Sequence, residues 1–360
     1  MSKTITVLIP AHNEEKIIQQ TIESVFTQTR MPDQVIVISD NSSDNTVKIA
    51  QKMKEIYGES LIIYETIDNK TKKAGALNQV LNKFTLSDFI LVMDADTVLD
   101  KNVLKEGMKY MKNEVMIGAV CSKAGLLPYE GDSRWGKLLW YLQHLEYGTF
   151  DSYRVETYEK VKVCHGMCTL FRAEALRSVK SFRKAWLDID IGYFDEHNLV
   201  EDLELTTCVA QNWKTAVNLN MLAFTEVPVS LKELWIQRTR WFRGGIDCIK
   251  THGINKVTKY EILGHILFIL KLVLTILIWA MTINFYFAYG FTMTVSLPFL
   301  CIMALGVYNS LYRIKYVHNW NKWDVIIRLS IIPETLYYWF NSVALIKSYY
   351  MVLLNIKQKW

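Results

Sequence analysis

Two carboxylates separated by a single residue, Asp94 and Asp96, directly follow the apolar run 89–93. Side chains with this spacing, just past the end of a strand, can both approach one cation. A hard divalent ion such as Mg²⁺ prefers oxygen ligands and also binds phosphate oxygens. The pair therefore predicts a metal-assisted site for a phosphorylated substrate, with a solvated acidic turn as the alternative.

A pair of lysines, Lys72 and Lys73, precedes three small residues at the predicted start of a helix. Helix N-termini favour anions, and a lysine at that position adds positive charge. The turn is therefore a candidate phosphate-binding element, with a solvated basic loop as the alternative.

Two further motifs carry candidate chemistry. Glu201 and Asp202 open a predicted helix, where they can complement the helix dipole or supply a general base for an acceptor hydroxyl. The segment 237–241, QRTRW, combines arginine, which suits pyrophosphate, with a tryptophan that offers a flat face to a sugar ring. An aromatic and basic belt at a membrane interface is the alternative explanation for this segment.

The elements that must position these residues alternate between strand and helix over the first hundred residues. Strands are predicted at 4–10, 34–40, 61–66 and 88–94, and helices at 13–29, 46–57 and 74–84. Near-continuous apolar strands with intervening helices indicate a mostly parallel, doubly wound α/β sheet with helices on both faces. Ligands bind at the carboxyl ends of such strands, where the polar clusters 10–14, 40–46 and 94–96 lie.

The middle of the chain is predicted as a mixed region with a strand at 117–123 and helices at 135–147 and 200–211. A helix at 230–249 is amphipathic and rich in tryptophan, arginine and lysine, a composition that suits a membrane interface. These patterns divide the chain into a catalytic domain at 1–229, an interfacial segment at 230–261 and a membrane region at 262–360.

The last hundred residues are dominated by apolar and aromatic runs. Stretches at 262–288, 291–311 and 325–354 are each long enough to cross the roughly 30 Å hydrocarbon core, which predicts about three transmembrane helices. The connection between the second and third stretches is basic. By the positive-inside rule it lies in the cytoplasm, so we expect a multi-pass protein of the plasma membrane whose residues 1–261 are cytoplasmic.

Charge and cysteine content narrow the function classes. A net charge of +5 without blocks of like charge, and without zinc-finger spacing, gives no reason to expect a nucleic-acid partner. The six cysteines form no CxxC pair, and no signal peptide is expected, so we interpret the thiols as reduced and cytosolic. Cys164, His165 and Cys168 match no zinc pattern.

Taken in order along the chain, these motifs resemble the processive members of glycosyltransferase family 2, which include hyaluronan, chitin, cellulose and poly-N-acetylglucosamine synthases. The resemblance covers about residues 4–250 and extends more loosely into the apolar region. The residues that carry it are Pro10-Ala11-His12-Asn13-Glu14, Asp40 in SDNSSDNT, Lys73 in KAGALN, Asp94-Ala95-Asp96, Glu201-Asp202, and Gln237, Arg240 and Trp241 of a QxxRW pattern. It implies a GT-A type fold.

The resemblance also implies a role for each of these residues. Pro10, Ala11, Glu14 and Asp40 would hold the nucleoside; Lys73, Asp94, Ala95 and Arg240 would complete the nucleotide-sugar site; Asp96, with Asp94, would ligate Mg²⁺ or Mn²⁺; Asp202 would be the catalytic base. Glu201, Gln237 and Trp241 would lie on the acceptor side, as would Gly166 in the segment 164–172.

The implied activity is inverting transfer of a sugar from a UDP-sugar, with UDP-N-acetylglucosamine as the leading expectation, to a growing saccharide. Two alternatives stay open: transfer of one sugar to a lipid phosphate, against which QxxRW argues, and a non-catalytic nucleotide-binding scaffold or transport component of the membrane. Unlike many polymer synthases, the sequence shows no transmembrane helices before the catalytic domain and no FxVTxK-type loop after QRTRW. With about three spans, we expect the chain to need a partner subunit, to form a homo-oligomer or to make a short product. We also expect the spans to contact membrane lipids.

Overall fold

Strands that are apolar along almost their whole length form the buried centre of this computed structural model, which describes residues 3–85, 87–187, 192–290 and 297–356. Eight strands pair in the order β3-β2-β1-β4-β7-β6-β8-β5. The first four along the chain are β1 (Ile5–Ala11), β2 (Gln34–Ser39), β3 (Leu61–Glu65) and β4 (Phe89–Met93), and they pair in parallel. Every residue of β1 and β4 is buried, as expected for strands covered on both faces.

The second half of the sheet is mixed. It contains β5 (Thr97–Leu99), β6 (Ile117–Leu126), β7 (Cys168–Arg172) and β8 (Lys214–Thr225). β7 runs antiparallel to both of its neighbours, β4 and β6, while β6 and β8 are parallel. The predicted sheet was more uniformly parallel than this, because the five residues of β7 run straight into a helix without a turn residue to mark a separate strand.

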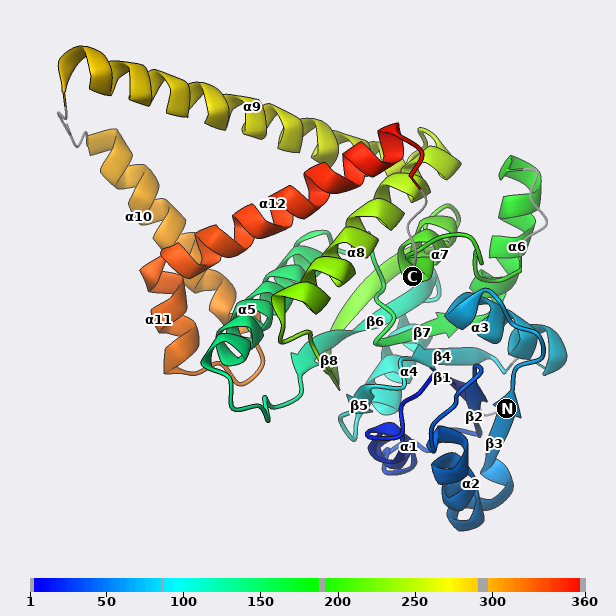
Figure 1. Cartoon of the computed structure of the whole chain (residues 1–360). Helices are drawn as coiled ribbons and strands as arrows, with labels where there is room; N and C mark the ends of the chain where they lie inside the picture. The colour runs from blue at the N-terminus through cyan, green and yellow to red at the C-terminus, as the bar shows by residue number, and fades with distance from the viewer. Residues whose placement is uncertain (1–2, 86, 188–191, 291–296, 357–360) are drawn as a thin grey trace.

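Six helices cover the two faces of the sheet (Figure 1). One face packs against α1 (Ile18–Phe26), α2 (Thr46–Tyr57) and α4 (Val103–Asn113), and the other against α3 (Lys72–Lys83), α6 (Ala173–Leu187) and α7 (Glu201–Val209). The prediction of helices on both faces is confirmed. α1 begins five residues after the predicted start at Asn13, because Asn13 has a φ of 59° and its side chain accepts a hydrogen bond from the Ser43 amide.

Two further long helices each begin at a serine N-cap. α5 (Arg134–Glu156) extends the predicted helix at 135–147 by more than two turns, and α8 (Leu231–His252) carries the QRTRW segment. Ser133 and Ser230 cap their first turns by accepting hydrogen bonds from the amides of Gly136 and Glu233. α8 lies alongside the last long helix of the chain, α12 (Ile332–Leu353) (Figure 1).

The apolar C-terminal region confirms one helix of sufficient length, and the other two predicted spans stay unconfirmed. Among the described helices, only α9 (Thr258–Tyr289) is long and apolar enough to cross a membrane. The second predicted span includes residues 291–296, outside the described residues, and its helix α10 (Leu297–Tyr312) leads into a short 3-10 turn at Arg313–Tyr316. The third divides into α11 (Lys322–Ser330) and α12, with Ile331 at a φ of 61° between them. Pro333 explains this break, because it cannot donate the backbone hydrogen bond that would continue α11.

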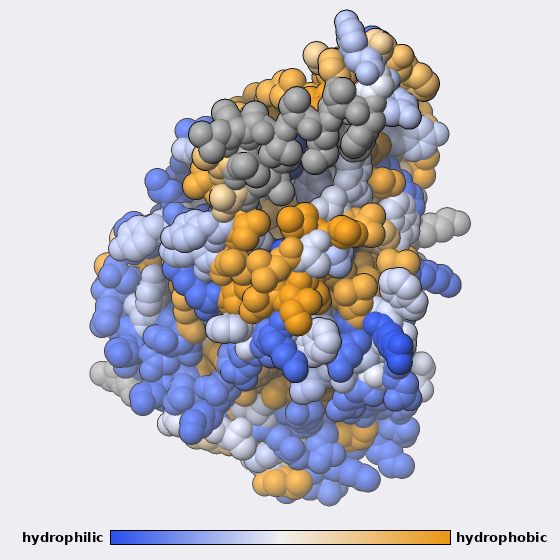
Figure 2. Space-filling model, turned by 90° about the vertical axis from the view of Figure 1, so that its left-hand side faces the viewer, coloured by the Kyte–Doolittle hydropathy of each residue, from blue (hydrophilic) through white to orange (hydrophobic). Residues whose placement is uncertain are grey.

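The surface of this region is apolar. α9 and α10 reach away from the sheet (Figure 1), and Figure 2 shows hydrophobic side chains gathered across the middle of that side of the molecule, above a hydrophilic lower part. Exposed apolar side chains on α10, α11 and α12 include Leu305, Tyr308, Ile326, Leu329, Leu336 and Trp339. An apolar surface of this extent marks a contact with lipid or with another protein.

Candidate active site

A cavity of about 1490 Å³ opens at the carboxyl ends of β1, β2 and β4, between the first turns of α3 and α7, the last turns of α5 and the middle of α8. All fourteen residues singled out from the sequence line it: Pro10, Ala11, Glu14, Asp40, Lys73, Asp94, Ala95, Asp96, Gly166, Glu201, Asp202, Gln237, Arg240 and Trp241. The structure therefore brings together segments that lie more than 200 residues apart in the sequence.

Asp40, directly after β2, organises one end of the cavity. Its Oδ1 accepts hydrogen bonds from Thr66 Oγ1 at 2.9 Å, Asn69 Nδ2 at 2.8 Å and Asn41 Nδ2 at 2.9 Å. These bonds tie the loops after β2 and β3 to each other. The buried carboxylate is thereby fixed beside Pro10 and Ala11 at the end of β1.

Lys73 joins three motifs through ion pairs. Its Nζ lies 2.5 Å from Asp94 Oδ1 and 2.8 Å from Glu201 Oε1. Burial alone would lower the pKa of Lys73, but the two carboxylates outweigh it and raise that pKa, so the lysine is held as a cation. Glu201, which was expected on the acceptor side, belongs to this pair of salt bridges. Burial opposes its ionisation, yet Lys73, followed by Arg240, lowers its pKa.

Asp96 lies in an acidic part of the cavity. Thr225 Oγ1 donates to its Oδ1 at 3.3 Å, and burial together with the charge of Asp94 raises the pKa of Asp96 to about 7. Burial and the charge of Asp96 likewise raise the pKa of Glu14 to about 7. A divalent cation would remove this electrostatic penalty, and an all-oxygen donor set suits Mg²⁺ or Mn²⁺. The residues present therefore fit such an ion.

Asp202 lies in the first turn of α7, and two backbone amides hold its carboxylate. Gly166 N donates to its Oδ2 at 3.1 Å and Leu203 N to its Oδ1 at 2.8 Å. Burial and then the neighbouring charge of Glu201 raise the pKa of Asp202 above its ordinary value. The carboxylate is thus fixed in direction and made more basic, as a proton acceptor requires.

α8 brings Gln237, Arg240 and Trp241 to the opposite wall of the cavity. Arg240 is close enough to influence the ionisation of both Lys72 and Glu201, which places its positive charge beside the Lys73 ion pairs. Gln237 Oε1 is buried without a hydrogen-bond partner among the described residues. Buried carbonyl oxygens are rarely left unpaired, so this atom is a candidate acceptor for a ligand hydroxyl.

Sequence reasoning missed the contribution of α5. Tyr147, Phe150 and Tyr153 of this helix line the cavity, as does Arg154, which forms a 2.8 Å ion pair with the buried Asp151. Their spacing of three residues would have identified a common helix face. The predicted helix ended at Tyr147, however, so the aromatic row was not recognised.

His165 lies at the cavity wall as a neutral imidazole. Its Nε2 donates to the Ser122 carbonyl oxygen at 2.9 Å, while Nδ1 is buried without a partner among the described residues. Burial and then the nearby charge of Arg154 lower the pKa of His165 to about 3. The folded protein therefore resists protonating this ring.

We expect this resistance to make the protein less stable in mild acid. Between pH 7 and 5 the unfolded chain binds a proton at this histidine, whose unfolded pKa is 6.5, and the folded chain does not. The contribution to the free energy of unfolding is on the order of 2 kcal/mol over that interval. Urea unfolding in detergent at several pH values should give a shallower pH dependence for His165→Gln than for the unchanged protein. Equal slopes would contradict the assignment.

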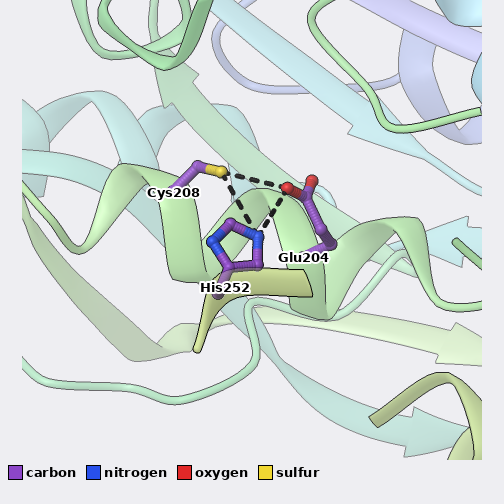
Figure 3. A group of neighbouring side chains, drawn as sticks. All are labelled: Glu204, Cys208 and His252. Carbon is purple, nitrogen blue, oxygen red and sulfur yellow. Dashed lines mark hydrogen bonds and ion pairs between the residues drawn. The ribbon is translucent and has the colours of Figure 1, made fainter. Parts of the chain in front are cut away.

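A second group of possible metal ligands lies away from the cavity, between α7 and α8 (Figure 3). Glu204 Oε1 is 2.9 Å from His252 Nε2 and 3.1 Å from Cys208 Sγ. Glu204 also forms a buried ion pair with Arg183. Burial would raise the pKa of Glu204, but the hydrogen bond from His252 and then the charge of Arg183 lower it to about 2. Because Arg183 already neutralises the carboxylate, we interpret the group as an ion-paired clasp between helices and assign no metal to it.

Comparison with known proteins adds independent information. Residues 6–180 match the family described as glycosyl transferase family 2. The chain is 27% identical over 255 residues to a poly-beta-1,6-N-acetyl-D-glucosamine synthase of Staphylococcus aureus (strain COL), and 25% identical over 255 residues to the enzyme of the same description from Staphylococcus epidermidis. Each match covers 68% of this chain and 55% of the relative, so the chain spans about half the length of these curated relatives.

The fold is similar to that of a mannosyltransferase from Pyrobaculum calidifontis, solved with GDP-Man and Mn²⁺. The TM-score is 0.58 at 18% identity, with 93% of this chain and 87% of that chain covered. At this level of identity the likeness concerns the arrangement of the sheet and its helices.

Proposed function

We propose that this chain, whose residues 6–180 match glycosyl transferase family 2, transfers a sugar from a UDP-sugar to a saccharide acceptor in a single displacement. The observation that carries the proposal is the convergence of a backbone-held carboxylate, Asp202, with the cations Lys73 and Arg240 in one cavity. A proton acceptor and a set of charges for a diphosphate are the two requirements of this reaction.

In the proposed reaction Asp202 takes the proton of an acceptor hydroxyl while that oxygen attacks the anomeric carbon of the donor. The bond from the anomeric carbon to the diphosphate oxygen breaks on the opposite face, which inverts the configuration. Negative charge grows on the departing diphosphate, where Lys73 and Arg240 stabilise it. Mg²⁺ or Mn²⁺, held by Asp94 and Asp96, would supply further electrostatic stabilisation of the leaving group.

The nucleoside half of the donor is proposed to occupy the end of the cavity formed by Pro10, Ala11, Glu14 and Asp40. A fixed carboxylate such as that of Asp40 suits the N3–H donor of uracil. For the sugar we propose N-acetylglucosamine, because the two Staphylococcus relatives are described as synthases of a poly-N-acetylglucosamine.

On the acceptor side we propose Gly166, Gln237 and Trp241 together with the aromatic row of α5. Tryptophan and tyrosine rings offer apolar faces to sugar rings, and the unpaired Gln237 Oε1 offers an acceptor to a hydroxyl. Glu201 would act on this side through Lys73 rather than by direct contact, since the two form an ion pair. We propose a plasma-membrane location with the cavity on the cytoplasmic side, supported by the apolar α9.

The function is tested by incubating the full chain in detergent with a panel of radiolabelled UDP-sugars, with Mn²⁺, Mg²⁺ or EDTA, and by sizing the products. We expect the fastest release of UDP from UDP-N-acetylglucosamine, loss of release in EDTA, and a saccharide ladder. A single sugar attached to a lipid phosphate would replace the proposed acceptor. No nucleotide release from any donor with either metal would overturn the proposal.

A further inference from the structure

We propose that Arg238, which does not itself line the cavity, is the residue that positions Trp241. In a cluster of three residues, the buried Arg238 is held in place by the partly buried Glu146 and Tyr337. The consequence for acceptor binding rests on the proposed function, in which Trp241 lies against the acceptor. Arg238 is the second residue of QRTRW, and the sequence offered no reason to separate it from an interfacial basic belt.

The cluster joins three helices that are far apart in the sequence. Arg238 Nη2 of α8 forms an ion pair with Glu146 Oε2 of α5 and donates a 2.8 Å hydrogen bond to Tyr337 Oη of α12. Tyr337 Oη donates in turn to Glu146 Oε2 at 2.8 Å. Each group thus touches the other two, and the position of the guanidinium is fixed from both α5 and α12.

The guanidinium also packs on the tryptophan. Arg238 Cζ lies 4.2 Å from the centroid of the Trp241 ring, a cation–π contact between residues three apart on one helix. Trp241 lines the cavity and Arg238 does not. The ring contact therefore connects Arg238 to the cavity.

Stabilising the fold does not by itself explain why a guanidinium is buried here. Arg238 is 1% exposed, and its Nε and Nη1 atoms have no hydrogen-bond partner among the described residues. Buried ion pairs are often no better for stability than apolar residues of the same volume, and unpaired buried donors make this one less favourable. A guanidinium plane stacked on a ring provides a fixed orientation for that ring, which an apolar residue would not.

The first arm of the test follows the ring without relying on activity. The full chain is labelled with 5-fluorotryptophan, and the ¹⁹F resonance of Trp241 is identified as the one missing from Trp241→Phe. We expect Arg238→Lys and Glu146→Gln to shift or broaden that resonance. Arg328→Lys is the matched control, because Arg328 forms a partly buried pair with Glu334 and contacts α5 at Leu145 and Thr149. An unchanged Trp241 resonance in Arg238→Lys, or an equal change in Arg328→Lys, overturns the proposal.

The second arm measures kinetics with a saccharide acceptor. We expect Arg238→Lys to raise the KM for acceptor about tenfold, with kcat and the KM for donor within about threefold, since one oriented contact is lost. In a Trp241→Ala background the same change should have no further effect. An equal effect in both backgrounds shows that Arg238 does not act through the ring. A Trp241→Ala variant with an unchanged acceptor KM would instead contradict the acceptor role in the proposed function, while the ¹⁹F result would still decide the positioning role.

Discussion

Replacing Asp202 with asparagine is expected to lower the rate of sugar transfer by about 10²–10⁴-fold, the usual contribution of a positioned general base. Asparagine has nearly the same shape but cannot accept the proton of the acceptor hydroxyl. The backbone amides of Gly166 and Leu203 that direct the carboxylate remain in place. UDP binding should be retained, because the ion pairs of Lys73 with Asp94 and Glu201 do not involve Asp202.

The change is measured as initial velocity with labelled donor, alongside UDP affinity by calorimetry. Asp247→Asn serves as the control, since Asp247 also lies on a helix but pairs with Arg243 outside the cavity. A purified Asp202→Asn protein with near-normal transfer would show that another group removes the proton. Loss of both transfer and UDP binding would indicate a damaged site rather than a missing base.

Replacing Asp96 with asparagine is expected to have the second-largest effect, a loss of transfer of about 10²-fold or more. In the protein without metal, burial and the charge of Asp94 raise the pKa of Asp96 to about 7, so the ionised form carries a penalty that a cation would relieve. The variant loses that charge, and with it most of the attraction for Mn²⁺ or Mg²⁺.

The accompanying measurement is the increase in Tm on addition of Mn²⁺, which should be present in the unchanged protein at pH 7.5 and nearly absent in Asp96→Asn. Asp132→Asn, an exposed carboxylate in the loop before α5, should leave both activity and the Mn²⁺ effect unaltered. If Asp96→Asn kept the full Mn²⁺ stabilisation, the ion would have to be held elsewhere.

The parts of the fold that follow from local pattern were predictable. The strands β1 to β4 are continuous apolar runs, and their polar ends meet because the carboxyl ends of parallel strands share one edge of a sheet. For this reason Asp40 and Asp94 could be assigned to a single site, and the family resemblance added Asp202 and Arg240 to it. All four residues line one cavity.

What the sequence could not show depends on contacts between distant segments. β7 pairs antiparallel with both neighbours because the chain returns from α5 in the opposite direction, and no local pattern encodes that return. Arg238 meets Glu146 across 92 residues and Tyr337 across 99, so its role is visible only once the helices are packed. In the apolar region, hydropathy alone predicted one continuous segment at 325–354. The structure has two helices there, α11 and α12, and Pro333 explains the break between them.

The most direct test of one-step, base-assisted transfer is the anomeric configuration of the product. The purified chain is given an α-linked UDP-sugar such as UDP-N-acetylglucosamine, and the new glycosidic linkage is determined by NMR. A single displacement with Asp202 as base predicts a β-linked saccharide. An α-linked product would contradict the account, because a single in-line displacement with Asp202 as base cannot retain the configuration of the donor.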